Sequence, residues 1–240
     1  MSGGIFHTIF YQPVYNLTVF FIDVLPGGSV ALAVILTTVV VKFILFPLTK
    51  KALLTQIKMR EIEPQMDSLK KKHKDDKQAQ GKAMLDLYRE AKVNPFASII
   101  VLIIQIPVII ALYWIFYKGG LPQINLDILY PFINSPESVS MKFFIFDIAQ
   151  KIWILAALAG ITQYIQARLS FPPLPPKKEG EVPSFKDDFA RNMQLQMKYF
   201  FPVLIVFISH SLASAVALYF VVSNIFTIGQ ELALRRHRKV

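Results

Sequence analysis

The stretch SVALAVILTTVVVKFILFPLTKK, residues 29–51, is an apolar run with a single cation inside it, Lys42. As a helix with a rise of ~1.5 Å per residue, residues 30–48 would be about 28 Å long, which matches a hydrocarbon core of about 30 Å. About 12 Å of helix separates Lys42 from the Lys50–Lys51 pair that closes the run. A lysine side chain covers only part of that distance. The ammonium therefore either reaches the interface through a thinned bilayer or lies in a polar cavity between helices.

The rest of the composition also indicates a protein that lives in lipid. The chain has 240 residues, of which 54% are hydrophobic and 18% charged. Of its 26 Lys and Arg, 22 fall in residues 50–92, 168–198 and 235–239, which the positive-inside rule places in the cytoplasm. The first residues have neither the basic n-region nor the cleavage site of a signal peptide. We predict a multi-pass protein of a bacterial plasma membrane, with the N-terminus outside and the C-terminus cytoplasmic.

The sequence argues against enzymatic chemistry. It has no cysteine, which excludes disulfides, thiol catalysis, cysteine lipidation and a cysteine-based metal site. Its four histidines are scattered and do not have metal-ligand spacing, and no Walker loop, HExxH motif or nucleophile elbow occurs. We therefore expect no catalytic residue, no cofactor and no metal site.

Residues 5–25 are apolar and aromatic but are interrupted by Pro13 and Asn16 and closed by Asp23. Their helical periodicity predicts a helix lying in the outer interface, before a Pro-Gly-Gly turn at 26–28. The alternative is a sixth span. That alternative would place the N-terminus inside, although this end carries no basic residue.

The last apolar region, residues 199–230, is too long for one ordinary crossing and short for two. One crossing would put the basic cluster 235–239 outside. Two short crossings that turn near 210–214 put it inside with the other basic segments. We therefore predict two crossings, short enough to thin the bilayer locally.

The predicted fold is all-α: a polytopic membrane protein with five transmembrane helices around a hydrophilic groove, a cytoplasmic helical hairpin and an N-terminal interfacial helix. It is a single domain over residues 1–240. In chain order the segments are the interfacial helix (5–25), span 1 (29–49), the cytoplasmic hairpin (50–92), span 2 (95–118), an external loop (119–146), span 3 (148–169), a cytoplasmic loop (170–198), span 4 (199–211), span 5 (213–231) and a basic tail (232–240). Asn94 is the predicted N-cap of span 2, with Pro95 at its first helical position.

The cytoplasmic hairpin carries twelve Lys and Arg against seven acids, with a polar tip near 71–81. Apolar residues keep a helical spacing on both sides of this tip. The charges are equally consistent with a solvated face that sets topology and with a surface that binds a partner. The length of the segment favours docking.

Several uncharged polar residues lie in the predicted spans. Thr38 and Lys42 are four residues apart and share a helix face. Gln105, Gln163 and Asn224 supply hydrogen-bonding groups from other spans, although amides in a membrane more often bind a neighbouring helix than a ligand. No span supplies an acidic partner for Lys42, because Asp147 and Glu231 are expected at helix ends. Together, the cation and the neutral polar groups are what a water-filled groove open to the cytoplasm requires.

Three motifs carry a family resemblance. They are VVVKFILFPLTKKALLTQIKMREIEPQMDSLKKKH (39–73), VNPFASIIVLIIQIPVIIALYWIFY (93–117) and ALYFVVSNIFTIGQ (217–230). In this order they resemble the YidC family of membrane protein insertases, whose relatives assemble respiratory and thylakoid membranes, over nearly the whole chain from about residue 10. The resemblance implies a five-span core with a hydrophilic groove open to cytoplasm and lipid, and a mobile cytoplasmic hairpin. The family's groove arginine falls on Lys42, which keeps the positive charge without the rigid five-donor fork.

We expect an insertase that lets the polar flank of a nascent membrane protein enter the groove while its apolar segment moves into lipid. In this hypothesis Lys42 attracts acidic residues of the client, and Thr38, Gln105, Gln163 and Asn224 line its path. The expected partners are nascent membrane proteins, the ribosome, the lipid bilayer, and also the Sec translocon and the signal recognition particle receptor. Two alternatives stay open: a small secondary transporter or anion-conducting pore that uses Lys42, and a purely structural assembly factor. No internal repeat supports the transporter.

Overall fold

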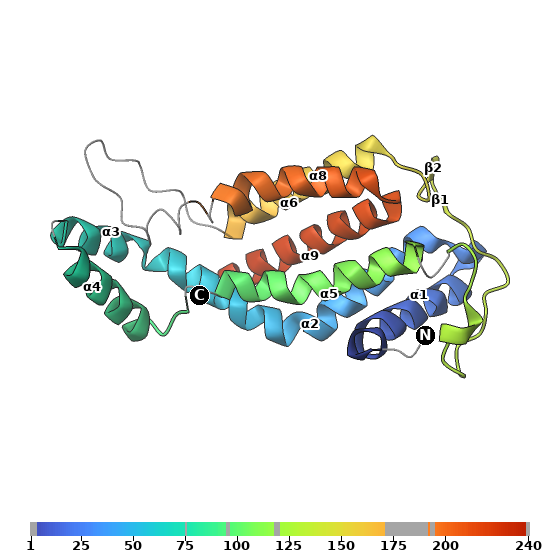
Figure 1. Cartoon of the computed structure of the whole chain (residues 1–240), viewed down its shortest axis with the longest axis horizontal. Coiled ribbons are helices and arrows are strands. Elements are labelled where there is room, and N and C mark those ends of the chain that lie inside the picture. Colours follow the sequence, from blue (N-terminus) through green and yellow to red (C-terminus); the bar gives the residue numbers. More distant parts are fainter. Residues whose placement is uncertain are drawn as a thin grey trace.

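The computed structural model describes residues 4–74, 76–94, 97–117, 121–170, 192 and 195–238. The described part is mostly helical and elongated, with the long helices running roughly along one axis (Figure 1). The one exception to the predicted all-α fold, within these residues, is a short two-stranded sheet at the end of the loop predicted at 119–146, which we call the external loop after its predicted side.

The chain begins with a π-helical turn, η1 (His7–Tyr11), and the helix α1 (Gln12–Val24). Tyr15, Val19 and Ile22 form the fully buried side of α1, which packs against α2 and α5. Their spacing of three and four residues is what places one apolar stripe on the core. The helix predicted at 5–25 is therefore part of the helix bundle, and it ends at the short 3-10 turn η2 (Pro26–Gly28).

Gly28 closes this turn at a place where only glycine fits. Its φ is +61°, which is the left-handed region. A Cβ atom there would collide with the backbone carbonyl of Ser138, which belongs to the external loop. The turn and the loop are joined by hydrogen bonds from the Ser140 N–H to the Gly28 carbonyl (2.9 Å) and from the Val30 N–H to the Ser140 carbonyl (3.0 Å).

Helix α2 (Val30–Glu61) is longer than the span predicted at 29–49 and includes the first part of the segment predicted as a hairpin. Pro47 lies inside it without ending it. The hairpin itself is α3 (Glu63–Lys72) with α4 (Lys77–Glu90). Pro64, in the first turn of α3, cannot donate to the previous turn, which explains why α2 stops just before it.

Helix α5 (Ala97–Tyr117) corresponds to the span predicted at 95–118, and Pro107 lies inside it. The predicted helix start at Pro95 lies outside the described residues. Beyond residue 120 the external loop contains the 3-10 turn η3 (Leu126–Ile128) and two antiparallel strands, β1 (Lys142–Phe143) and β2 (Phe146–Asp147).

Asn16 holds the external loop against α1. Its amide nitrogen donates to the Ile128 carbonyl (2.9 Å), and its amide oxygen accepts from the Tyr130 N–H (2.6 Å). The Tyr15 hydroxyl accepts from the Asn125 N–H at 2.8 Å. Asn16 is 2% exposed, so an unpaired amide here would be costly. The polar residue that interrupts the apolar run 5–25 thus has a structural role.

Helix α6 (Trp153–Ser170) begins five residues later than the span predicted at 148–169. The preceding residues bind the start of α9 instead: the Ser214 N–H donates to the Gln150 carbonyl (3.1 Å), and the Ser214 hydroxyl accepts from the Ile152 N–H (2.8 Å). Most of the cytoplasmic loop predicted at 170–198, residues 171–191, lies outside the described residues.

The apolar region 199–230 forms two helices. The π-helical turn η4 (Gln196–Phe200) leads into α8 (Phe201–Ser211), and α9 (Ser214–Arg238) follows. Leu212 between them is extended (φ −105°, ψ 177°), at the place where the sequence predicts the turn. However, α9 continues well past residue 231, so the tail predicted at 232–240 begins as part of the helix.

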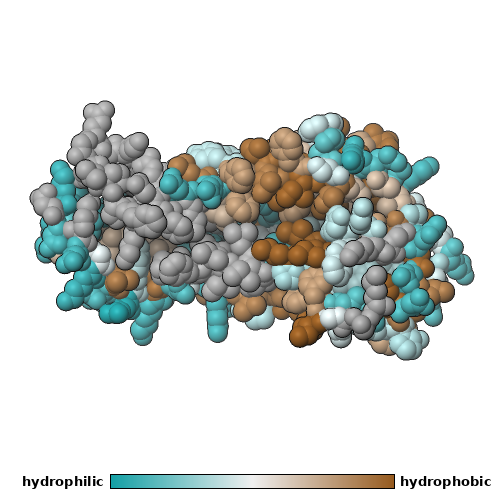
Figure 2. Space-filling view, in the orientation of Figure 1, coloured by the Kyte–Doolittle hydropathy of each residue, from teal (hydrophilic) through white to brown (hydrophobic). Residues whose placement is uncertain are grey.

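Helix α6 packs against both α8 and α9, and α9 also packs against α2. The α3–α4 hairpin extends beyond the end of the bundle where α9 finishes, and β1 and β2 lie at the opposite end (Figure 1). Among the described residues, two helices are long and apolar enough to cross a membrane: Val30–Glu61 and Ser214–Arg236. Figure 2 shows apolar surface gathered mainly over the middle of the molecule and hydrophilic surface toward its ends.

Candidate functional site

Lys42 lies where α2, α5 and α9 meet. Its ammonium donates to the amide oxygen of Gln105 on α5 (3.2 Å) and to the hydroxyl of Thr227 on α9 (3.2 Å). Both partners are neutral. The Thr227 hydroxyl donates its own proton to the Ser223 carbonyl (2.9 Å), so its oxygen is free to accept from the lysine. The Gln105 amide nitrogen binds the Tyr219 hydroxyl. We call Lys42, Gln105, Tyr219 and Thr227 the lysine cluster.

A small cavity adjoins the lysine cluster. Its volume is about 20 Å³, and it is lined by Lys42, Leu45, Thr49, Leu53, Gln105, Thr227 and Gln230. A site of this size holds about one water molecule. Because an ammonium has three donors and two are used by Gln105 and Thr227, the third is available to a molecule in the cavity. Thr49, Leu53 and Gln230 place the cavity on the side of Lys42 nearer the α3–α4 hairpin.

Two of the other predicted groove residues are bound within the helix bundle. The Thr38 hydroxyl donates to the Val34 carbonyl of its own helix (2.6 Å), and the residue is buried. The Asn224 amide nitrogen binds the Thr162 hydroxyl (3.2 Å) and thereby ties α9 to α6. The shared face of Thr38 and Lys42 therefore does not bring them into one polar cluster.

Of the five predicted groove residues, the structure brings together only Lys42 and Gln105. The other members of the cluster, Tyr219 and Thr227, were missed by the sequence analysis. A signal for them exists: Tyr219, Ser223 and Thr227 are each four residues apart and form one polar stripe on α9. The stripe is hard to recognise because Tyr219 reads as an apolar aromatic residue in a membrane-like sequence.

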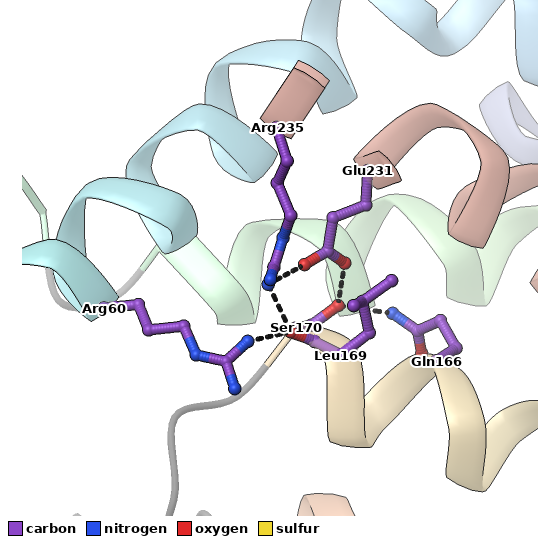
Figure 3. A network of polar contacts seen from close by, with 6 residues as sticks. All are labelled: Arg60, Gln166, Leu169, Ser170, Glu231 and Arg235. Atoms are coloured by element: carbon purple, nitrogen blue, oxygen red, sulfur yellow. Dashed lines mark hydrogen bonds and ion pairs between the residues drawn. The ribbon is translucent and has the colours of Figure 1, made fainter. Parts of the chain in front are cut away.

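Gln163, the fifth predicted residue, binds Gln166, which belongs to a second set of polar contacts at the hairpin end of the bundle; Figure 3 shows this set from Gln166 onward. Its amide donates to Gln166 (3.2 Å), Gln166 donates to the Ser170 hydroxyl (3.0 Å), and that hydroxyl donates to the Glu231 carboxylate (2.6 Å). The other carboxylate oxygen of Glu231 pairs with Arg235 at 2.6 Å.

Two arginines from different helices converge on the last turn of α6. Arg60 near the end of α2 donates to the Leu169 carbonyl (2.8 Å), and Arg235 donates to the same oxygen (2.5 Å) (Figure 3). The last carbonyls of a helix have no partner in that helix and attract cations. We call Arg60, Leu169, Ser170, Glu231 and Arg235 the inner network. It joins α2, α6 and α9.

The prediction that Glu231 lies at a helix end is wrong. Helix α9 continues to Arg238, and Glu231 is 1% exposed. Its charge is matched by Arg235 one turn later, so it is the acidic member of the inner network and not a partner of Lys42.

Another carboxyl group, that of Glu63 in α3, has a shifted pKa. Partial burial raises this pKa most, and the carboxylate of Asp67 raises it further, while the cations of Arg60 and Lys70 lower it.

Comparison of the sequence with known proteins identifies a family and several relatives. Residues 21–240 match the family model described as 60Kd inner membrane protein. The chain is 34% identical over 210 residues to the Membrane protein insertase YidC of Francisella tularensis subsp. novicida (strain U112) and, with the same values, to that of Francisella tularensis subsp. tularensis (strain WY96-3418). The alignments cover 88% of this chain and 33% of each relative. The chain thus spans about a third of the length of these curated relatives.

Proposed function

The chain belongs to the 60Kd inner membrane protein family, the family of the YidC insertases, and from this premise we propose that it inserts nascent membrane proteins into a bacterial inner membrane. The observation that carries the proposal is the Lys42 ammonium, whose hydrogen-bond partners among the described residues are neutral groups of two other helices. A cation inside an apolar bundle is costly, and such residues mark polar pathways. A client with a polar flank would supply the counter-charge.

We propose that α2, α5, α6, α8 and α9 each cross the membrane and that the cavity beside Lys42 is the inner part of a groove that widens when a client enters. The polar flank of the client would slide along this groove while its apolar segment moves into lipid. No covalent bond changes in this process. The driving force would be burial of the client's apolar segment in lipid together with the membrane potential, which contributes ~2.3 kcal/mol per charge per 100 mV.

The groove residues divide into two roles in this proposal. Lys42, Gln105 and Thr227 would contact the client, because they line the cavity. Thr38, Gln163 and Asn224 would act indirectly, because their side chains already bind neighbouring helical groups. This assignment narrows the groove expected from the sequence to the interface of α2, α5 and α9.

The ribosome is the partner proposed for the basic cytoplasmic surface, and the Sec translocon and the signal recognition particle receptor are proposed as further partners. The α3–α4 hairpin extends beyond the bundle, where it can reach them (Figure 1). Arg235 is not available for this purpose because it pairs with Glu231. The tail surface proposed for the ribosome therefore begins at Arg236, which is exposed.

Reconstitution tests the proposed function. The purified protein in liposomes is expected to integrate a short-tailed single-span client that stays outside empty liposomes. The matched measurement is flux of small anions across the same membranes without any client. Integration without flux supports an insertase, whereas anion flux without integration would support the transporter or pore instead. If neither client integration nor anion flux is observed, the result would favour the structural assembly factor.

Topology gives a second, separate test. Reporters fused after residues 80, 180 and 240 are expected in the cytoplasm, and one after residue 130 outside. The positive-inside rule predicts this arrangement, and the hairpin and the end of α9 lie at the same end of the bundle. Cysteine accessibility in intact cells can be used as an independent readout, because the chain has no cysteine of its own. A cytoplasmic reporter at residue 130 would rule out five spans.

A further inference from the structure

The β1–β2 hairpin of the external loop carries an apolar tip. Its turn consists of two residues, Phe144 and Ile145, between strands Lys142–Phe143 and Phe146–Asp147. Phe144 is 87% exposed and Ile145 is 90% exposed, more than the other large apolar residues among those described. Two neighbouring apolar side chains are thus fully presented to the surroundings at the outer end of the bundle.

The turn also goes against local preference. Phe144 has φ +53°, a left-handed conformation that is unfavourable for a bulky aromatic residue. A positive φ at the first position of a two-residue hairpin turn strongly favours glycine, and such turns otherwise use Asn, Asp or Gly. A sequence that departs from these turn preferences, without a stabilising contact in return, often does so because the residues have a function. Phe144 has an edge contact with the Phe143 ring (centroids 4.8 Å apart), but this contact leaves Phe144 87% exposed, so packing within the protein explains little of the choice of residues.

The base of the hairpin is held firmly against the bundle. Ile148, directly after β2, is completely buried, and its N–H donates to the Met141 carbonyl (2.9 Å). The Ala215 N–H of α9 donates to the Ile148 carbonyl (3.1 Å). The base is therefore joined to α9, and a few residues later the chain enters α6. A tip on such a base has a fixed position relative to these helices.

We infer that the Phe144–Ile145 tip inserts into the outer leaflet of the bilayer, at the boundary between headgroups and acyl chains. Two observations select lipid as the occupant. Exposed Trp153 and Ile154 open α6 a few residues after the hairpin, so a second exposed apolar pair, of the kind that faces lipid, follows the tip along the chain. Exposed Lys142 and Lys151 flank the tip along the chain and match the phosphates of the headgroups.

The tip would hold the outer leaflet close to a short helix. Helix α8 (11 residues) continues directly from η4 (5 residues), and together they make at most about 24 Å of helix at ~1.5 Å per residue, less than a hydrocarbon core of about 30 Å. A short span is accommodated by thinning the bilayer around it. An apolar wedge fixed beside α6 and α9 would stabilise that thinned state.

The test uses single cysteines labelled with an environment-sensitive fluorophore, in the full chain in phosphatidylethanolamine–phosphatidylglycerol vesicles. At Ile145→Cys we expect strong quenching by a nitroxide near the lipid carbonyls, and about threefold less quenching by aqueous iodide than at Glu137→Cys, an exposed control in the same loop. Equal iodide quenching at the two positions would overturn the inference. So would protection from iodide without quenching by the lipid nitroxide, because that result indicates a protein partner or a second copy.

In a second experiment the fluorophore is moved away from the tip, so that the label cannot itself drive the tip into lipid, and the apolar tip residues are replaced instead. Phe144→Gly with Ile145→Asn removes the apolar tip and supplies the residues that such a turn favours, so the unfolding temperature in detergent should not fall. With the label at Ala149→Cys on the exposed base of the hairpin, we expect about threefold more iodide quenching in this variant than with the native tip. Unchanged quenching would show that the tip does not hold the hairpin on the membrane.

Discussion

Replacing Glu231 by alanine is expected to lower the free energy of unfolding by about 3–5 kcal/mol, the cost of removing one partner from a buried ion pair. The loss is large because Glu231 is 1% exposed and both carboxylate oxygens are bound, one by Arg235 and one by Ser170. Without the carboxylate, Arg235 keeps only its bond to the Leu169 carbonyl among the contacts that hold it in the inner network. Unfolding measured in detergent against a denaturant series gives this number.

Three further variants make the result interpretable. Glu231→Gln keeps hydrogen-bonding capacity and removes the charge, so its loss should be smaller. Arg236→Ala is the matched control, because Arg236 is exposed on the next position of the same helix and should change stability little. Glu231→Leu combined with Arg235→Met replaces the pair by apolar groups, which is often neutral or stabilising. An alanine variant as stable as the native chain would show that the inner network contributes nothing to the fold.

The inner network could not be predicted from the sequence. Glu231 was assigned to a helix end because the apolar run stops there, but a helix does not have to end where hydrophobicity ends. Helix α9 continues past the apolar run because the backbone hydrogen bonds between residues four apart form equally well between polar residues. No proline lies in residues 214–238 to interrupt them. The partner of Glu231 one turn later is readable as an i, i+4 pair. Its bond to Ser170 is a contact between distant segments that no local pattern encodes.

The same reasoning explains why helix α2 ends later than the span predicted from composition. The span at 29–49 was closed at the Lys50–Lys51 pair because charge marks the end of the lipid-facing part. Helix α2 nevertheless runs to Glu61, and only Pro64 explains its end. The helix break at Leu212 lies where charge sidedness predicts a reversal between two crossings. Composition thus indicates where lipid contact ends, while proline indicates where the helix ends.

The lysine cluster was predictable in part. Lys42 and Gln105 stand out as polar residues in apolar runs, and the structure brings them together. That Asn224 binds α6 while Thr227, three residues later, binds Lys42 depends on the rotation of α9 between its neighbours. This rotation is set by packing against α2 and α6, which a hydropathy pattern does not specify.

Lys42 variants should change insertion more strongly than any other substitution in the lysine cluster. Lys42→Arg is expected to preserve insertion, and Lys42→Ala to reduce it by about ten- to a hundredfold for clients with acidic tails, because hydrogen bonds to a charged group contribute about 1.5–3 kcal/mol. Lys42→Glu should be worst for the same clients, since it replaces attraction by repulsion. The measurement is insertion yield into proteoliposomes at matched amounts of folded protein, with Glu137→Ala as a control at an exposed charged residue.

Insertion yield, read together with stability, separates this mechanism from an anchoring role for the lysine. Loss of the cation removes a cost of about 2.5–3.5 kcal/mol on insertion scales, which offsets the two lost hydrogen bonds to Gln105 and Thr227. Lys42→Ala should therefore be about as stable as the native chain while it inserts acidic-tailed clients poorly. If the ammonium only reached toward the interface as an anchor, the variant would be as stable and would insert every client normally. That outcome would remove Lys42 from the mechanism and leave the fold and the family unchanged.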